Sequence, residues 1–435
     1  MERPMTSPPR EVGYLELLRR NRTFRAYFTA NALSNLGTWL TTIAMFVVIT
    51  DLSGRPELGL GFVFVSRMFA LALPQPFAGM LADRYSRKWL MVASNVASAV
   101  CAFALLTVHT ADDLPLFFVL IISLMVLHAV YIPAESAAMP NITRPEELLT
   151  ANAMNSATWS IALSLGSAIG GFMVSAYGVE IAFIIDGITF LVAAGMISML
   201  HVPQDESERK GSILVEGPAQ IIDGFRRIIN TPPVRRILTV KALWASFGGG
   251  LVYLLVLLGD EIGAVDIAAG IGVLFAARGI GTGIGPIIGR ALFRERSRWP
   301  LLMGLMVSAC GVCYVLIGLL TWTPWIAVLV IAGHAASGAN WVFSTVLLQE
   351  RTEDDWRGRV FGADFMLMTS MNGLSALAAS LLIEYGGLSL RTALLWFAVG
   401  QVASGLLWLL LMLPGERRFA AAPAAAVGET AAITA

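Results

Sequence analysis

Apolar runs of bilayer length fill most of this sequence, and they limit what the chain can fold into. The runs 58–81 and 89–108 are two examples, and each reaches the roughly 20 residues that a helix needs to cross a bilayer. Of the 435 residues, 56% are hydrophobic and only 14% are charged, and the mean hydropathy is +0.71. Soluble domains do not have this composition. The sequence therefore predicts an all-α, polytopic membrane protein.

About twelve such runs follow one another along the chain. We place them at 25–50, 58–82, 88–109, 114–139, 149–177, 180–201, 234–258, 264–292, 299–321, 324–348, 358–384 and 389–413. The longest polar stretch lies between the sixth and seventh runs, and Ile221, Phe225 and Ile228 lie on one face of a helix there. This pattern predicts an amphipathic helix on the cytoplasmic surface that joins two halves.

These runs divide the chain into five parts. They are a cytoplasmic N-terminal segment (1–24), an N-terminal six-helix half (25–201), a linker with the amphipathic helix (202–233), a C-terminal six-helix half (234–413) and a disordered C-terminal tail (414–435). The Ala-rich composition of the tail is typical of a segment without a packed structure.

The basic residues give the orientation of the chain in the membrane. With these spans, 26 lysines and arginines fall on one side or at the adjoining helix ends, and only Arg55 and Arg391 fall in loops on the other side. Cytoplasmic loops carry the excess of basic residues. We therefore expect both termini in the cytoplasm.

A weak internal repeat supports two halves of similar structure. A shift of 210 positions places the segment 79–89 on the segment 289–299. A glycine, an arginine, the last basic residue and a tryptophan coincide, whereas Asp83 meets Phe293. Repeated six-helix halves with a midplane site for the substrate are how many transporter folds are built.

Motifs for other kinds of chemistry are absent from the sequence. It has no H-E-x-x-H or G-x-S-x-G pattern and no G-x-x-x-x-G-K-[ST] loop. Its three cysteines, Cys101, Cys310 and Cys313, all fall within apolar runs, where they are expected to be buried small side chains. The sequence therefore predicts neither an enzyme nor a bound cofactor or metal.

A dense cluster of charges, from Gly79 to Lys88, lies between the second and third runs. Such a cluster cannot lie in lipid, so it predicts a tight turn at the membrane surface, on the cytoplasmic side because three of its residues are basic. The segment resembles the signature G-x-L-a-D-R-x-G-R-K of major facilitator superfamily transporters. The matching residues are Gly79, Leu81, Asp83, Arg84, Arg87 and Lys88, and Ser86 stands where the family usually has glycine.

The resemblance implies the major facilitator fold and a conformational latch in this turn. In similar transporters the aspartate pairs with the basic residue and faces the start of the eleventh helix, which here lies near Arg357 and Arg359. Asp83 and Arg87 are four residues apart and can pair if the helix continues into the turn. Glu135, at the cytoplasmic end of the fourth span, could join this latch. The alternative, charges that only set the topology, explains the arginines but not Asp83.

A second resemblance narrows the family. The segments 131–140 and 147–153 look like the fourth-to-fifth helix region of the drug-exporter branch that includes macrolide-efflux proteins and enterobactin exporters. Gln349-Glu350, followed by the segment 357–362, fits the same branch. This resemblance implies export driven by protons, whereas the residues alone indicate only a transporter with two halves.

Charged residues within spans are costly and are therefore candidates for function. Arg67 and Arg278 are near-equivalents under the repeat and could bind an anionic group or pair with acids. Asp186 and Asp364 could carry the coupled proton, as could Glu135. Asp186 also lies in a stretch that resembles a structural motif of one transporter branch. The membrane histidines, His128 and His334, are more typical of hydrogen bonds between helices.

Two stripes of small residues and a pair of prolines predict how the helices pack. The stripes are Ala162, Gly166 and Gly170 in the fifth span and Gly281, Gly285 and Gly289 in the eighth. Small residues at this spacing let helix backbones approach closely. They resemble the surfaces on which the two halves rock, and the alternative is ordinary contact within one half. Pro74 and Pro76 should bend the second span.

The leading hypothesis is a secondary active exporter that works by alternating access as a proton antiporter in the cytoplasmic (inner) membrane. Many Met, Phe and Trp residues in the spans favour small, amphipathic, drug-like cargo. An alternative is movement of a lysophospholipid or siderophore, whose anionic group would suit Arg67 and Arg278. A non-transporting sensor of the same fold is a further alternative. The expected partners are the cargo, protons and the lipid bilayer, with no nucleic acid, and we expect a monomer.

Overall fold

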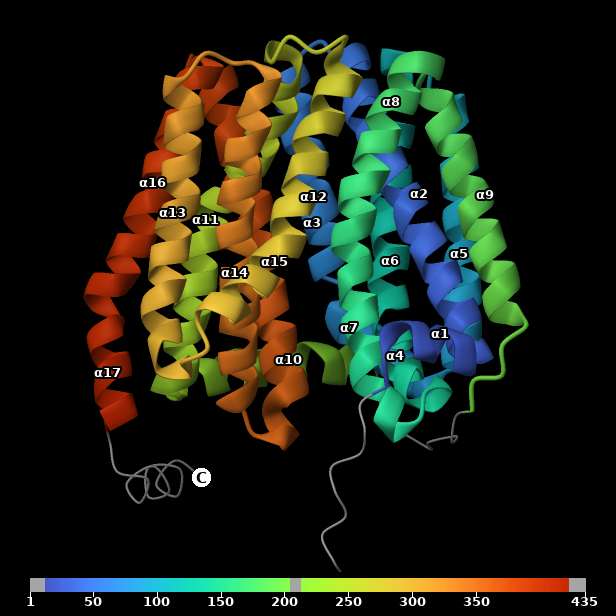
Figure 1. Cartoon of the computed structure of the whole chain (residues 1–435). Helices are drawn as coiled ribbons and strands as arrows, with labels where there is room; N and C mark the ends of the chain where they lie inside the picture. Colours follow the sequence, from blue (N-terminus) through green and yellow to red (C-terminus); the bar gives the residue numbers. More distant parts are fainter. Residues whose placement is uncertain (1–11, 204–212, 422–435) are drawn as a thin grey trace, which may run out of the picture. The chain divides into compact units, whose positions relative to one another are not determined.

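The computed structural model describes residues 12–203 and 213–421, and these residues fold into helices without any strand. Twelve of the helical segments are long and apolar enough to cross a membrane. A helix forms its backbone hydrogen bonds within one segment, which lipid requires because it offers no partners. The prediction of an all-α membrane protein with twelve spans is therefore confirmed (Figure 1).

The first six spans follow a short surface helix. The elements are α1 (Tyr14–Arg20), α2 (Arg22–Leu52), α3 (Pro56–Ala72), α4 (Gln75–Arg84), α5 (Arg87–Ala104), α6 (Leu114–Ile142), α7 (Pro145–Ile161), the π-helical segment η3 (Ala162–Gly166), α8 (Ser167–Tyr177) and α9 (Val179–Ser198). The second span consists of α3 and α4, which a turn at Leu73 and Pro74 separates. This break confirms the predicted bend, because proline removes a helix hydrogen bond.

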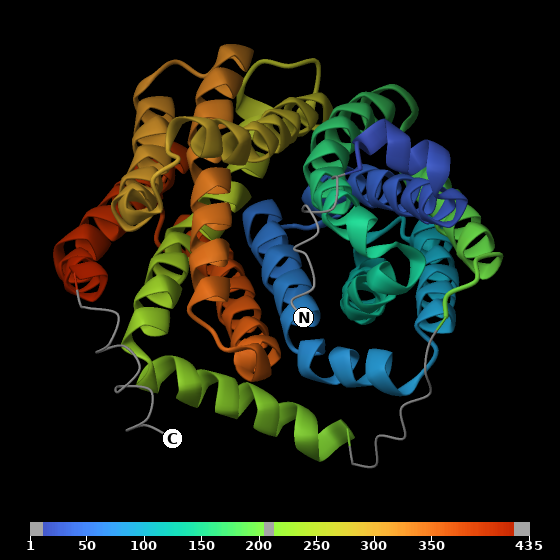
Figure 2. The same ribbon diagram turned by 60° about the horizontal axis from the view of Figure 1, so that its bottom comes forward.

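The later spans begin after a helix that occupies the predicted linker. The elements are α10 (Ile213–Asn230), α11 (Pro232–Glu261), α12 (Ile267–Leu292), α13 (Trp299–Leu319), α14 (Ala327–Glu350), α15 (Asp354–Glu384), α16 (Leu390–Leu411) and α17 (Leu413–Ala421). Figure 2 shows that α10 runs across the axis of α11 and leads directly into it. Short 3-10 turns connect some of the other helices.

Some predictions fall on residues that the structure does not describe. Residues 1–11, 204–212 and 422–435 contain parts of the predicted N-terminal segment, linker and tail, and four of the basic residues used for the orientation: Arg3, Arg10, Arg209 and Lys210. The described start of the predicted tail is not disordered, because residues 413–421 form α17. The orientation of the termini stays a prediction.

The chain forms two compact units. Unit 1 comprises residues 1–219 and 255–280, and unit 2 comprises residues 220–254 and 281–435. Residues 255–280 are the end of α11 and the first half of α12, so one long helix contributes to both units. We describe each unit separately.

Small residues allow close helix contacts in unit 1. A Cβ atom built on Gly166 would lie 2.9 Å from the carbonyl oxygen of Leu36, and one on Gly170 would lie 2.9 Å from the Cα of Leu40. The stripe of the fifth span therefore packs on α2. The contact between α8 and α12 is made by other residues, since a Cβ on Gly171 would lie 2.7 Å from the Cα of Gly272.

The stripe of the eighth span packs within unit 2. A Cβ on Gly281 would lie 3.0 Å from His334 Cβ, and one on Gly289 would lie 3.2 Å from Ala339 Cβ, both on α14. A Cβ on Gly285 would lie 2.8 Å from the Cα of Ala335. Ordinary contact within one half, the alternative for both stripes, thus describes the packing of Gly166, Gly170, Gly281, Gly285 and Gly289.

The linker helix α10 is held on the first turns of α15. Arg227 donates hydrogen bonds of 2.9 and 2.8 Å to the two carboxylate oxygens of Glu353, and its guanidinium lies 5.3 Å from the ring centroid of Trp356. A Cβ on Gly224 would lie 3.2 Å from Ala363 Cβ, so the two helices approach closely at this glycine. A larger residue at 224 would separate them.

Glu416 fastens α17 to the rest of unit 2. Its side chain is 2% exposed and accepts hydrogen bonds from Arg236 (2.5 Å) at the start of α11 and from Arg351 (2.6 Å) at the end of α14. The ring of Phe419 lies 5.8 Å from the Arg236 guanidinium and 5.2 Å from that of Arg351. One buried carboxylate therefore neutralises two arginines and joins three helices.

We predict that Glu416→Ala lowers the free energy of unfolding by about 3 kcal/mol, because removing the acid leaves two arginines without their partner in a buried place. Thermal unfolding of the purified protein in detergent measures this effect. The matched control is Glu353→Ala, which removes an acid that is 57% exposed and also pairs with an arginine. It should cost less than about 1 kcal/mol. Equal effects of the two variants would contradict the role assigned to Glu416.

Candidate functional site

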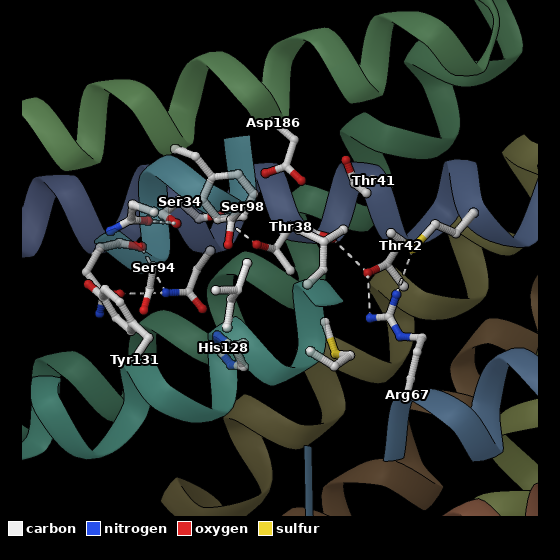
Figure 3. Close-up of a pocket in the computed structure, with 18 residues that line it drawn as sticks. Ser34, Thr38, Thr41, Thr42, Arg67, Ser94, Ser98, His128, Tyr131 and Asp186 are labelled. Atoms are coloured by element: carbon white, nitrogen blue, oxygen red, sulfur yellow. Dashed lines mark hydrogen bonds between the residues drawn. The ribbon is translucent and has the colours of Figure 1, made fainter. Parts of the chain in front are cut away.

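A polar pocket lies among five helices of unit 1 (Figure 3). Most of the side chains around it are polar: Asn31, Ser34, Asn35, Thr38, Thr41 and Thr42 of α2, Arg67 of α3, Ser94, Asn95 and Ser98 of α5, His128 and Tyr131 of α6, and Asp186 of α9. Met45, Leu124, Met125, Leu127 and Phe190 form its apolar part. The pocket thus brings together two of the charged residues predicted from the sequence, Arg67 and Asp186.

The hydroxyl groups of α2 face the pocket because they recur at helical spacing. Ser34, Thr38, Thr41 and Thr42 lie three or four residues apart and so share one face of the helix. Thr38 donates its hydroxyl hydrogen to the Ser34 carbonyl (2.9 Å), and Thr42 donates to the Thr38 carbonyl (2.7 Å). A hydroxyl used in this way still has oxygen lone pairs to accept a hydrogen bond. This face can therefore receive N–H or O–H groups of a cargo.

Arg67 and Asp186 enter the pocket from different helices (Figure 3). The Arg67 guanidinium donates to Thr42 Oγ1 (3.2 Å) and contacts Met45 Sδ (2.9 Å). Asp186 is 1% exposed, and Thr189 donates to its backbone carbonyl (2.8 Å). A Cβ on Gly37 would lie 2.6 Å from Asp186 Oδ1, so α2 and α9 are closely packed at this carboxylate. The partners of Arg67 are neutral, and no ion pair joins it to Asp186 in the described residues.

His128 and Tyr131 were not predicted to belong to this site. They lie one turn apart on α6 and line the pocket together with Arg67 and Asp186 (Figure 3). The hydroxyl-rich lining was not predicted either. A count of polar residues at helical spacing within the first span would have shown that one face of α2 is unusually polar for a membrane helix.

Glu135 is the centre of a separate network in unit 1. This half-turn neighbour of the pocket is 9% exposed and accepts hydrogen bonds from Tyr27 (2.5 Å) and Asn31 (2.7 Å) of α2. Asn31 also donates to Asn155 of α7 (2.7 Å). Glu135 therefore links the fourth span to the first, and its part in a latch with the signature turn stays a prediction.

The signature turn is built from the end of α4 and the start of α5. Helix α4 ends at Arg84 and α5 begins at Arg87, so the helix does not continue from Asp83 to Arg87 as the pairing at helical spacing requires. Arg87 donates instead to the Ala137 carbonyl of α6 (2.9 Å), and the Lys88 ammonium lies 5.1 Å from the Trp89 ring centroid. The latch of Asp83 with the eleventh span stays a prediction.

Arg278 does not line the pocket, although the repeat makes it a near-equivalent of Arg67. Its guanidinium lies 6.0 Å from the ring centroid of Trp159 and 5.7 Å from that of Phe275 within unit 1. Aromatic faces attract a cation, which explains how this arginine is accommodated in a span.

Unit 2 contains a buried ion pair between Lys241 of α11 and Asp364 of α15. The sequence indicated Asp364 as a candidate, but Lys241 was counted with the basic residues of the cytoplasmic surface. It lies well inside α11, where it is 2% exposed, and its ammonium lies 4.6 Å from the Trp341 ring centroid. A lysine more than two turns inside a span is itself a signal of a specific partner.

The described residues contain no group of three His, Cys, Asp or Glu side chains that could hold a metal ion. The charged groups of the site are thus the side chains themselves: Arg67 and Asp186 in unit 1, and Lys241 and Asp364 in unit 2. Their arrangement is suited to binding and releasing ions, protons or polar cargo.

Solved structures of transporters have the same fold. A nucleoside transporter, NupG, superposes with a TM-score of 0.67 at 16% identity, covering 89% of this chain and 98% of that one. A bacterial homologue of the human lysosomal transporter Spinster gives a TM-score of 0.67 at 14% identity and covers 90% and 97% of the two chains. At these identities the similarity concerns the fold.

Curated relatives are transporters as well. The enterobactin exporter EntS of Salmonella choleraesuis (strain SC-B67) is 26% identical over 423 residues, which cover 94% of this chain and 96% of EntS. The proposed bacilysin exporter BacE of Bacillus subtilis is 28% identical over 298 residues, 66% of this chain and 71% of BacE. The match to YkuC of Bacillus subtilis (strain 168), an uncharacterised transporter, spans only 45% of YkuC.

The family comparison covers most of the twelve spans. The sequence model of the Major Facilitator Superfamily matches residues 27–376, from the start of the first span into the eleventh. Together with the fold, this match shows that the chain is a multi-pass membrane transporter rather than an enzyme, and that it belongs to the major facilitator superfamily.

Proposed function

We propose that this transporter exports small amphipathic molecules from the cytoplasm by alternating access, in exchange for protons, and that it does so as a monomer in the cytoplasmic membrane. The observation that carries this proposal is the polar pocket in which a buried acid, Asp186, and a base, Arg67, lie without an ion pair between them. The exporter names of two relatives support the direction of transport.

The chemistry of exchange follows from the position of Asp186. A buried carboxylate within a span is costly as an ion, and it can be stabilised by a proton or by a positive group nearby. Cargo and proton that act on one small pocket affect each other's binding, and such a coupling free energy is what couples two fluxes. Protonation of Asp186 would remove the negative charge of the pocket, so a cargo that prefers the charged pocket leaves when the proton arrives.

The pocket also limits the kind of cargo. Its hydroxyl face accepts hydrogen bonds, and Met45, Met125 and Phe190 provide an apolar part that can adapt to different shapes. A site with an apolar wall and a few placed polar groups is typical of small-molecule binding. We therefore propose a cargo with one polar or charged end and one apolar end.

We predict that Asp186→Asn abolishes ethidium uptake driven by a pH gradient into inside-out vesicles, because the amide cannot bind the coupled proton. Ethidium counterflow, which needs no gradient, should continue at a rate within about threefold of wild type, because the cargo site keeps its other groups. Both rates are measured by ethidium fluorescence. The control is Asp112→Asn, which changes an exposed acid before the fourth span. Gradient-driven uptake by Asp186→Asn would move the proton-binding role to another acid.

A siderophore or lysophospholipid is the second candidate for the cargo. Arg67 supports it, because the guanidinium reaches the pocket with only a hydroxyl and a thioether as partners and can offer paired N–H groups to an anion. The similarity to an enterobactin exporter over 94% of this chain points in the same direction. A non-transporting sensor of this fold would show no accumulation of any cargo in vesicles.

We predict that Arg67→Gln weakens the binding of enterobactin or lysophosphatidylglycerol by about tenfold or more, since a charge-assisted bidentate pair is lost. Arg67→Lys should recover only part of the affinity, because an ammonium does not match two oxygens at once. Binding is measured by displacement of a fluorescent analogue. Arg278→Gln is the control, since Arg278 lies outside the pocket. An unchanged affinity in Arg67→Gln would exclude this anion site.

We further infer that the signature turn acts as the latch predicted from the sequence. Asp83→Asn should slow gradient-driven uptake in the same vesicles by about tenfold, because the turn would lose the charge that holds one transport state. Arg87→Lys is informative as its companion, since Arg87 is tied to α6 and a lysine keeps the charge. Wild-type uptake by Asp83→Asn would leave the turn with a topological role only.

A further inference from the structure

Lys241 and Asp364 form the most deeply buried ion pair described in the protein. Their side chains are 2% and 5% exposed, and they join α11 to α15 within unit 2. The Lys241 ammonium also lies 4.6 Å from the Trp341 ring centroid of α14. Packing alone does not need such a pair, because apolar residues of similar volume often stabilise a buried place as well.

Asp364 has an acceptor that the pair does not use. Lys241 binds Oδ2, whereas Oδ1 is buried and has no hydrogen-bond partner in the described part of the chain. A carboxylate accepts several hydrogen bonds, so this oxygen is available to a donor other than Lys241.

Two half-buried indole rings stand beside this pair. The ring centroids of Trp244 and Trp341 are 6.3 Å apart, and Trp244 donates its N–H to Ser337 Oγ (2.9 Å). That hydrogen bond fixes the Trp244 ring in place. Indole faces are the best of the aromatic side chains at attracting a cation. A carboxylate flanked by such rings is a site for a positively charged group.

We propose that a cationic group of the cargo replaces the Lys241 ammonium at Asp364, and that Lys241 then releases one proton. The inference rests on the proposed function and names its cargo class as organic cations. In this step an N–H bond of the ammonium breaks, its electron pair stays on nitrogen, and the proton leaves to water. The site holds one positive and one negative charge before and after the exchange. Because an uncompensated buried charge is strongly unfavourable, cation binding and proton release are obligatorily coupled.

Other ionisable side chains around the pair have partners of their own. On the helices that surround it, Arg236 pairs with Glu416, His334 contacts Tyr314, Arg357 pairs with Asp354, Arg227 pairs with Glu353 and Arg226 pairs with Asp223. Lys241 is therefore the group whose charge responds directly to a cation at Asp364.

Ethidium added to the purified full-length protein in weakly buffered detergent solution tests the exchange. Binding is followed by fluorescence anisotropy, and proton release is followed by a pH indicator. The wild type should release about one proton for each ethidium bound. Lys241→Gln should bind ethidium at least about tenfold more tightly and release no proton, because Asp364 then lacks its internal cation. Asp364→Asn should lose binding by a similar factor.

A structural salt bridge would behave differently in these variants. Lys241→Gln would then bind ethidium no more tightly than wild type, and proton release would persist; either result overturns the proposal. Asp355→Asn, an exposed acid on the same helix, is the matched control. If the single variants fail to fold, the double variant Lys241→Met with Asp364→Leu removes the pair without leaving a buried charge. It should bind ethidium weakly without releasing a proton, and wild-type release by it also overturns the proposal.

Vesicle transport separates this proposal from the proposed function. If gradient-driven export occurs for enterobactin or another probe but ethidium releases no proton from the purified protein, only the cation exchange at Asp364 fails. If no probe is transported in response to a pH gradient, the exporter function fails. Ethidium-dependent proton release that requires Lys241 supports the exchange even then, because it is measured without transport.

Discussion

The cost of a charge inside the membrane governs the arrangement of this protein. A charged side chain within a span needs a partner, a polar pocket or an aromatic face. The structure uses each of these: Lys241 pairs with Asp364, Arg67 lies in a pocket with Thr42, and Arg278 lies against aromatic rings. The helices are brought together at these points, so the charges that a transporter needs also decide which of its spans pack side by side.

The two units use this constraint in different ways. In unit 1 an acid and a base line one polar pocket without pairing, so each can act on a cargo separately. In unit 2 Lys241 and Asp364 neutralise each other, and a cargo must displace one to reach the other. The first arrangement favours binding, because its groups are already available. The second favours coupling, because its groups respond only when the ion pair is broken.

Sequence reasoning predicted the spans, the break at Pro74 and three of the four central charged residues, because length, composition and proline act locally. It did not predict Lys241, since a lysine ten positions into an α-helix of 30 residues can be counted with either the surface or the core until a partner is known. It also missed that Gly171 and Gly272, rather than the stripes of small residues, bring α8 and α12 together. Spacing shows which residues share a face of a helix, but not which other helix that face meets.

The choice of cargo follows from charge balance more than from the size of a cavity. The pocket of unit 1 holds one acid and one base, and the ion pair of unit 2 does too, so each site is neutral when all four groups are ionised. A cation that enters either site adds a charge that burial makes costly, and the release of a proton removes it. A neutral molecule makes no such demand and would cross without a coupled proton. Proton exchange therefore selects for charged cargo, even where the walls of the site accept many shapes.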